Sequence, residues 1–426
     1  MRMFRLKGLR GVTLALSTMI AALYGSTDAS RAADPIKVGF AMQLTGPLAG
    51  NGKAALLGAQ IWADEVNKAG GLIGRPVELV VYDDQSNPGL VPGIYSKLLD
   101  VDKVDLLLSN NTNQTAPAMP TIIQHKRLIM GMFALAINEQ FKYPGYFQIQ
   151  PYGPNGKDSL TRGFFENAIA MNPKPTTVAL VGADAEFSKN ALDGARAQAK
   201  RLGLNIVYDK VYPPTTVNFT PVLKAMQATS PDLVFVASYP SDTVGIIRTA
   251  HEINLEPKVF GGAMVGTQYA AIKQQLGEAL NGVLSFEQYI PEPTVKFPGI
   301  EDMLKKYQAK AAEQGVDVLG YYVPAFVYSA LQVLGEAVTK TGGVDQQKLI
   351  SYIHGNKFTT VVGDIAFGPD GEWVEPRMFA VQFRNIKGND VQQFTQPGKE
   401  VIIYPPKYKS GDLVYPFVNA QKNAQN

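Results

Sequence analysis

The chain has 426 residues, among them 40 lysines and arginines, 37 aspartates and glutamates and no cysteine. The lack of cysteine excludes disulfides, thiolate metal sites, cysteine nucleophiles and a lipid-modified cysteine anchor. The near-balance of charge provides no basic field of the kind that nucleic acid or an anionic membrane requires, so we expect neither as a partner.

The first 33 residues have the pattern of an export signal. Four basic residues within the first ten precede an uncharged, largely apolar stretch over 11–23. Ser30 and Ala32 stand at the −3 and −1 positions of a small-residue cleavage pattern, which places the mature start near Ala33 or Asp34. The apolar stretch is short for a membrane span, so a retained anchor is the weaker alternative. We expect a periplasmic protein with a cleaved signal peptide.

From residue 36 onward, short apolar runs rich in β-branched residues alternate with longer helical patterns. The expected strands are 36–42, 77–82 and 104–108, and the expected helices are 54–69 and 93–99. This alternation is typical of βαβ units and predicts a parallel sheet.

The same rhythm restarts after residue 151. Strands are expected at 177–181, 205–211, 233–237 and 258–261, and helices at 189–202, 219–228 and 243–253. About 390 residues remain after the signal, which is too many for one ordinary core. We therefore expect an α/β protein with two doubly wound parallel-sheet lobes.

The later chain breaks this rhythm. A strand at 282–290 is followed by two helical patterns at 301–314 and 322–340 and by a β-rich tail. Proline and glycine interrupt extended runs at 150–154, 288–293 and 362–368, where we expect the chain to cross between the lobes and form a hinge. The first lobe then holds residues 34–151 and 290–361, and the second holds 152–289 and 362–426.

The first expected strand ends in the loop 45–54, which superficially resembles a phosphate-binding loop. The spacing from Gly46 to Gly52 is one residue too long, and Ala54 stands where such a loop needs a hydroxyl for magnesium. We therefore reject nucleotide binding. The loop still joins a strand end to a helix, which is where open α/β sheets bind ligands. A purely structural turn is the alternative.

Two further junctions between a strand and a helix carry polar side chains. The run 109–115 is polar throughout and precedes a helix that we expect to have Pro117 in its first turn. Free N–H groups and the helix dipole favour a carboxylate at such a point, although an ordinary helix cap uses the same residue types. In 238–242, Tyr239 is expected to point towards the space between the lobes, with a packing role as the alternative.

Signatures of catalysis are missing from the sequence. The three histidines lie far apart, and no Gly-x-Ser-x-Gly elbow is present. Asp83 and Asp84 follow a strand and are followed by Asn87-Pro88, which favours a turn over a metal or catalytic pair. We expect no enzyme activity, no cofactor and no metal.

Several segments together carry a family pattern. They are 36–39, 44–47, 70–76, 82–84 and the Thr/Asn-rich loop before Pro117. With these segments the chain resembles the periplasmic binding proteins of the branched-chain amino acid transport family, which includes the leucine/isoleucine/valine-binding proteins. The resemblance implies a type I periplasmic binding fold, ligand capture by hinge closure, and docking to an ATP-driven permease.

The resemblance also implies a set of cleft residues. In amino acid binders of this family, hydroxyl and N–H groups of the loop matching Thr112, Asn113 and Thr115 hold the ligand carboxylate. The other implied cleft residues are Asn51, Ala134, Ala136, Phe187, Tyr239 and Met264.

Met264 departs from the family pattern, because amino acid binders place an acid there for the ligand ammonium. A buried ammonium without an anionic partner is strongly penalised. Phe133, Leu135 and the two aromatic cleft residues favour an apolar or aromatic body. We therefore expect a monomeric binding protein that delivers a small non-amino carboxylate to the membrane permease of an ABC transporter. Apolar amino acids, amides and presentation of a ligand to a sensory receptor are the alternatives.

Overall fold

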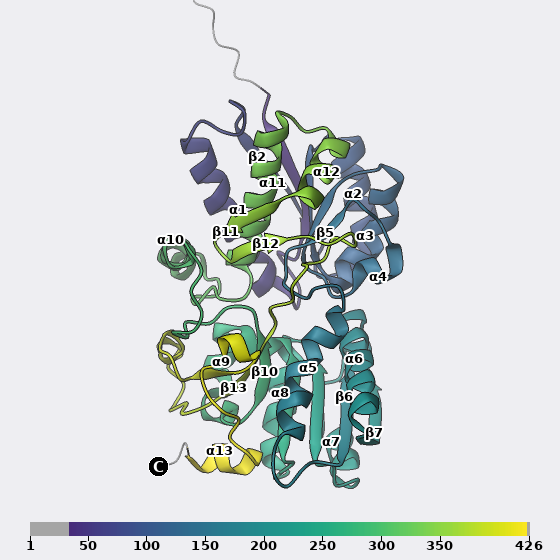
Figure 1. Ribbon diagram of the computed structural model, residues 1–426, viewed down its shortest axis with the longest axis vertical. Helices are drawn as coiled ribbons and strands as arrows, with labels where there is room; N and C mark the ends of the chain where they lie inside the picture. The colour runs from purple at the N-terminus through teal and green to yellow at the C-terminus, as the bar shows by residue number, and fades with distance from the viewer. Residues whose placement is uncertain (1–33, 424–426) are drawn as a thin grey trace, which may run out of the picture.

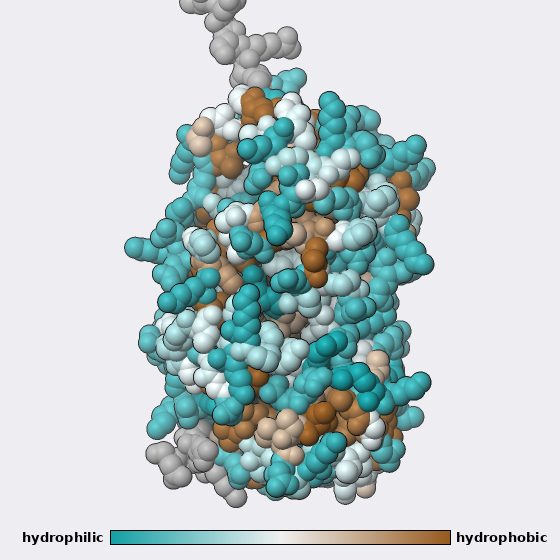
Figure 2. Space-filling model, viewed as in Figure 1, coloured by the Kyte–Doolittle hydropathy of each residue, from teal (hydrophilic) through white to brown (hydrophobic). Residues whose placement is uncertain are grey.

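In the computed structural model, described over residues 34–423, the chain forms two α/β lobes that follow one another along the long axis (Figure 1). The expected signal over 1–33 lies outside the described residues. Among the described helices, none is long and apolar enough to span a bilayer. The face drawn in Figure 2 is largely hydrophilic, with separate apolar patches on both lobes.

The first lobe is built on a five-stranded parallel sheet in the order β2-β1-β3-β4-β5. Its strands are β1 (Ile36–Met42), β2 (Val77–Asp83), β3 (Leu106–Asn111), β4 (Ile129–Phe133) and β5 (Tyr146–Gln148). Its helices are α1 (Ala49–Lys68), α2 (Val91–Asp100), α3 (Thr112–Gln124), α4 (Ile137–Phe141), α11 (Pro324–Thr341) and α12 (Gln346–Gly355), and α10 (Ile300–Gln314) packs against α1 and α11.

The second lobe is built on a seven-stranded sheet in the order β14-β13-β10-β9-β8-β6-β7. Its strands are β6 (Thr177–Ala183), β7 (Asn205–Tyr212), β8 (Leu233–Ser238), β9 (Val259–Met264), β10 (Leu284–Glu287), β13 (Phe379–Phe383) and β14 (Glu400–Tyr404). Its helices are α5 (Gly156–Ile169), α6 (Glu186–Leu202), α7 (Thr220–Gln227), α8 (Pro240–Glu252), α9 (Ala270–Leu276) and α13 (Phe417–Asn423).

Burial on both faces explains why the central strands are so apolar in sequence. Every residue of β4, β8 and β9 is buried, as expected for parallel strands with helices on both sides. The two-lobed α/β fold is confirmed. The second lobe is not all-parallel as expected, because the tail returns as β13, which pairs antiparallel with β10, and as β14, which pairs antiparallel with β13.

The chain passes between the lobes in three segments, 149–155, 288–299 and 367–378. The third segment lies later than the expected 362–368. The hairpin of β11 (Lys357–Thr360) and β12 (Gly363–Ala366) stays with the first lobe. The turn that follows it is also held there, because the Gln148 N–H of β5 donates to the Gly371 carbonyl at 2.9 Å and Phe367 forms a β-bridge with Trp373. The long descending segment after β12 is visible in Figure 1.

Arg377 ties the three crossing segments together. Its backbone N–H donates to the Pro151 carbonyl at 2.8 Å in the first segment, and its guanidinium carbon lies 4.0 Å from the Phe297 ring centre in the second. A side-chain nitrogen donates to the Val362 carbonyl at 2.5 Å. Burial lowers the pKa of Arg377 to about 10. The hinge region is therefore packed around a buried cation.

Asp83 and Asp84 form the turn that the sequence favoured. Asp83 accepts hydrogen bonds from the N–H groups of Leu44 and Gln85 and from the Thr45 hydroxyl. Burial alone would raise the pKa of Asp83, but these hydrogen bonds hold it below its usual value. Asp84 is buried and accepts one bond, from the Ser86 N–H at 2.9 Å. Burial raises the pKa of Asp84 to about 6.

Asp84→Asn tests this difference between neighbouring carboxylates. An acid whose pKa rises on folding lowers stability as pH climbs from its unfolded pKa towards its folded pKa. We expect the variant to gain stability over the wild type between pH of about 4 and about 6, reaching up to about 3 kcal/mol above that range. Urea unfolding across this pH range measures the gain.

Asp83→Asn is the matched control, because the pKa of Asp83 shifts in the opposite direction. This variant should lose stability relative to the wild type at neutral pH, and the loss should shrink as pH falls below about 4. A gain for Asp83→Asn, or a pH-independent effect for Asp84→Asn, would contradict the assignment.

Candidate functional site

A small chamber lies between the lobes, where the carboxyl ends of strands from both sheets meet. This is the edge at which open α/β sheets bind ligands. The cavity volume is about 20 Å³, enough for about one water molecule, so the two lobes are closed against each other. The residues that line it are Leu48, Asn51, Asn111, Thr112, Phe133, Tyr152, Phe187, Tyr239, Val265 and Tyr322.

Aromatic rings from both lobes dominate the wall of this chamber. Phe187 and Tyr239 of the second lobe meet edge to face with ring centres 6.0 Å apart. Phe133 and Tyr322 lie on the opposite side, also 6.0 Å apart. Tyr152 comes from the first crossing segment. Such a wall suits a flat apolar ligand, since edge-to-face and stacked contacts add to the burial of apolar area.

Thr112 supplies a hydroxyl to this chamber at the start of α3. The Asn111 side chain accepts from the Asn113 N–H at 3.0 Å and so begins the helix at Thr112, earlier than a first-turn Pro117 predicted. The Thr112 oxygen accepts from the Leu135 N–H at 2.9 Å, which leaves its own hydrogen available for donation. Together with the N-terminal end of the helix dipole, this hydroxyl favours an anion.

The structure brings four of the sequence-predicted residues together in the chamber: Asn51, Thr112, Phe187 and Tyr239. Asn113 lies at its rim, where it contacts Tyr239. Thr115, Ala134, Ala136 and Met264 do not line it.

Local hydrogen bonds and burial explain those four positions. The Thr115 hydroxyl is bonded to Ser109 Oγ at 3.0 Å and to the Asn110 carbonyl, so it is used inside the lobe. Ala134 is fully buried beneath the cleft, and Ala136 sits in a left-handed turn with φ of 59° before α4. Met264 is the last residue of β9 and is buried, so Val265 reaches the chamber instead.

Sequence reasoning missed Tyr152 and Tyr322 as chamber residues. Neither lies at the carboxyl end of a strand: Tyr152 directly follows Pro151, and Tyr322 stands two residues before Pro324. The only signal was their position beside expected crossings or helix starts, which does not show which way a ring points.

A hydrogen-bonded pair bridges the lobes at the rim of the chamber. The Asn113 amide and the Tyr239 hydroxyl are within hydrogen-bond distance through both amide atoms, at 3.0 Å for Nδ2 and 3.1 Å for Oδ1. The Phe187 N–H also donates to Asn113 Oδ1 at 3.3 Å. Burial raises the pKa of Tyr239, so its hydroxyl stays protonated. Outside this pair lies a vestibule lined by Pro47, Ser86, Pro214 and Ser241.

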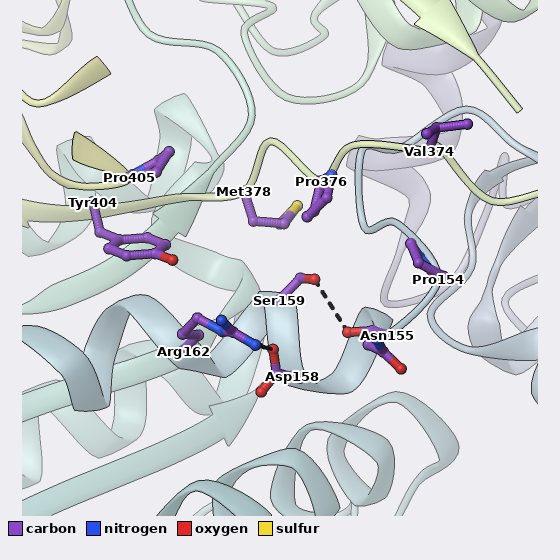
Figure 3. A pocket seen from close by; sticks show the side chains of 10 residues that line it. All are labelled: Pro154, Asn155, Asp158, Ser159, Arg162, Val374, Pro376, Met378, Tyr404 and Pro405. Carbon is purple, nitrogen blue, oxygen red and sulfur yellow. Dashed lines mark hydrogen bonds and ion pairs between the residues drawn. The ribbon is translucent and has the colours of Figure 1, made fainter. Parts of the chain in front are cut away.

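A larger hollow of about 200 Å³ lies beside α5 and β14 (Figure 3). Its one cation, Arg162, pairs with Asp158 one helical turn away, and the Ser159 hydroxyl donates to the Asn155 carbonyl. The charged pair and the Ser159 hydroxyl are thus satisfied locally, and the hollow is lined by the second lobe and by the first and third crossing segments. The chamber between the strand ends is the stronger candidate for a ligand site.

Comparison with known proteins decides the family. A family model described as periplasmic binding protein matches residues 35–389. The chain belongs to this family. It is 24% identical over 363 residues to a leucine-, isoleucine-, valine-, threonine- and alanine-binding protein of Pseudomonas aeruginosa, covering 84% of this chain and 93% of that relative. The resemblance predicted from the sequence is therefore confirmed.

Solved structures share the fold across most of both chains. A solute-binding protein of an ABC transporter from R. palustris, in complex with benzoate, has a TM-score of 0.72 at 17% identity and covers 89% of this chain and 98% of its own. The branched-chain amino acid binding protein LivJ of Streptococcus pneumoniae, in complex with isoleucine, has a TM-score of 0.69 at 19% identity, with coverage of 87% and 100%. These relatives are named as binding proteins rather than enzymes.

The Asn113–Tyr239 contact predicts a testable effect on lobe closure. Tyr239→Phe keeps the ring in the chamber wall and removes the hydroxyl that bridges the lobes, so the ligand-free protein should spend more time open. Because the chain has no cysteine, one spin label can be placed on each lobe through Val101→Cys and Val217→Cys, which are exposed. We expect longer and broader distances between the labels in Tyr239→Phe.

Tyr208→Phe is the matched control, since Tyr208 lies on β7 away from the chamber. It should leave the distance distribution unchanged. Identical distributions for wild type and Tyr239→Phe would show that the contact does not hold the lobes together.

Proposed function

We propose that this protein is the exported solute-binding component of an ABC importer and that its ligand is a small aromatic carboxylate. The observation that carries the ligand class is the lining of the chamber, in which five of ten residues are aromatic and none is charged. An α-ammonium in this chamber would lose its hydration without gaining an anionic partner. A benzoate-like acid would bury its ring against the aromatic wall and keep one polar end for Thr112.

Capture requires the lobes to separate first, because the closed chamber holds about one water molecule. In the proposed cycle, the lobes rotate about the three crossing segments, and the ring enters between Phe187 and Tyr239 on one side and Phe133 and Tyr322 on the other. Closure then surrounds the ligand. The closed, loaded form would be the species that docks to the membrane permease, after export directed by residues 1–33.

A branched-chain amino acid is the second candidate, favoured by the relative from P. aeruginosa and by the isoleucine complex. Two carboxylates beside the chamber argue against it, because protein groups already bond to both. Asp242 lines the vestibule and accepts from the Tyr239 N–H at 2.9 Å and from the Tyr212 hydroxyl. Asp317 lines an adjoining recess, but its oxygens already accept from the N–H groups of Ala270, Leu319 and Gly320 at 2.6, 3.0 and 2.8 Å. It therefore has little capacity left for an ammonium.

Titration calorimetry with matched ligand pairs tests the ligand class. The pairs are 3-phenylpropanoate with phenylalanine and 4-methylpentanoate with leucine, and benzoate serves as the smallest aromatic acid. Residues 34–426 should bind each deaminated acid at least about tenfold more tightly than its amino acid, since the acid avoids an unpaired buried charge. Tighter binding of leucine or phenylalanine than of the matching acid would reject the aromatic carboxylate.

Thr112→Val tests the anchor for the carboxylate. The change removes one charge-assisted hydrogen bond, which is worth about 1.5–3 kcal/mol, so benzoate should bind roughly 10–100-fold more weakly. Thr112→Ser keeps a hydroxyl and should restore most of the affinity. Thr115→Val should lower thermal stability while leaving affinity unchanged, because its hydroxyl is bonded within the lobe. Equal affinities of Thr112→Val and wild type would remove Thr112 from the site.

A further inference from the structure

We propose that a recess adjoining the chamber is a subsite for a ring hydroxyl, so that the preferred ligands are hydroxylated aromatic acids. This inference rests on the proposed function, because it assumes an aromatic acid in the chamber. The recess shares Asn51 and Tyr322 with the chamber wall and continues towards Gln268 and Tyr269. A ligand ring held beside Tyr322 would therefore direct a substituent towards those two side chains.

Gln268 presents an acceptor whose identity is fixed by its surroundings. The residue is 3% exposed, and its Nε2 donates to the Phe286 carbonyl at 3.1 Å and lies 3.5 Å from Glu287 Oε2. The Phe286 carbonyl can only accept, so the nitrogen must face it, and this contact sets the orientation of the amide. Its Oε1 is buried and has no partner among the described residues. A residue that lines the recess therefore carries an unsatisfied acceptor.

Tyr269, the next residue in the sequence, also lines the recess and carries a hydroxyl. Its ring packs against Tyr322 at an angle of 63°, with ring centres 6.1 Å apart. The hydroxyl is buried and has no partner in the described part of the chain. Burial raises the pKa of Tyr269 well above its usual value, so the group remains protonated and can donate. A buried polar group without a partner costs about 1–3 kcal/mol, and two in one recess require an explanation.

The chemistry of these two groups selects a ligand hydroxyl. A hydroxyl can donate to Gln268 Oε1 and accept from the Tyr269 hydroxyl, which satisfies both. A carboxylate could only accept, and it would face the carbonyl oxygen of Gln268. An ammonium could only donate and would leave the Tyr269 hydrogen unused. A resident water has the same hydrogen-bonding capacity as a hydroxyl, and in that case a ring hydroxyl would bring no gain in affinity.

Calorimetry with benzoate, 3-hydroxybenzoate and 4-hydroxybenzoate tests the subsite on wild type and Tyr269→Phe. Wild type should bind at least one hydroxybenzoate about tenfold or more tightly than benzoate. Tyr269→Phe should reduce affinity for that hydroxybenzoate about tenfold and change benzoate affinity less than about twofold. Because the lost hydroxyl has no protein partner, the variant should fold with an unchanged or higher melting temperature. Tyr208→Phe, away from the chamber, should alter none of these values.

The outcomes separate this inference from the proposed function. Equal affinity of wild type for benzoate and both hydroxybenzoates would overturn the subsite, and so would an equal loss of benzoate and hydroxybenzoate affinity in Tyr269→Phe. Both of those results leave aromatic acid binding intact. Binding of leucine without binding of any of the three aromatic acids would overturn the proposed function and the subsite together.

Discussion

Parallel strands that are buried on both faces have to release their chains at one common edge of the sheet, and this constraint produces the candidate site. In both lobes helices cover the central strands, so polar side chains gather at the carboxyl ends of those strands and in the segments that leave them. Asn111 ends β3, Thr112 follows it, and Tyr239 follows β8. The two edges face each other across the chamber, so these three residues line it together. At its rim Asn113 contacts Tyr239, although 126 positions separate the two residues in the sequence.

The repeating alternation of strand and helix made the fold and part of the site predictable. Period and punctuation identify where strands end, and they indicated the polar run that contains Thr112 and the junction that contains Tyr239. Asn51 and Phe187 were implied by the family resemblance. The same reasoning could not separate Thr112 from Thr115, because both are hydroxyl residues of one polar run. What separates them is the helix start fixed by Asn111, which turns the later hydroxyl back towards Ser109.

Chamber residues that come from irregular segments could not be predicted from the sequence. Tyr152 lies in a crossing segment and Tyr322 in the approach to α11, and no periodicity marks the direction of a side chain in such places. Met264 shows a related difficulty, because a difference of one residue decides whether a side chain ends the strand β9 or begins the turn that lines the chamber. Val265 takes the place in the wall, and the position still lacks an acid. The position of the third crossing segment in the sequence was likewise hard to predict. It depends on the hairpin of β11 and β12 staying with the first lobe, which involves contacts between residues far apart in the sequence.

The neutrality of the chamber has a consequence for where such a protein can work. A carboxylate held by hydroxyls, N–H groups and a helix end, without a guanidinium or ammonium, forms no ion pair that mobile salt could screen. Its affinity would change little between dilute and saline surroundings, whereas a site built on a partly exposed arginine would weaken as ionic strength rises. A binding protein outside the inner membrane meets whatever salinity the cell encounters. An uncharged aromatic chamber would therefore hold its proposed ligand with similar affinity at low and at high ionic strength.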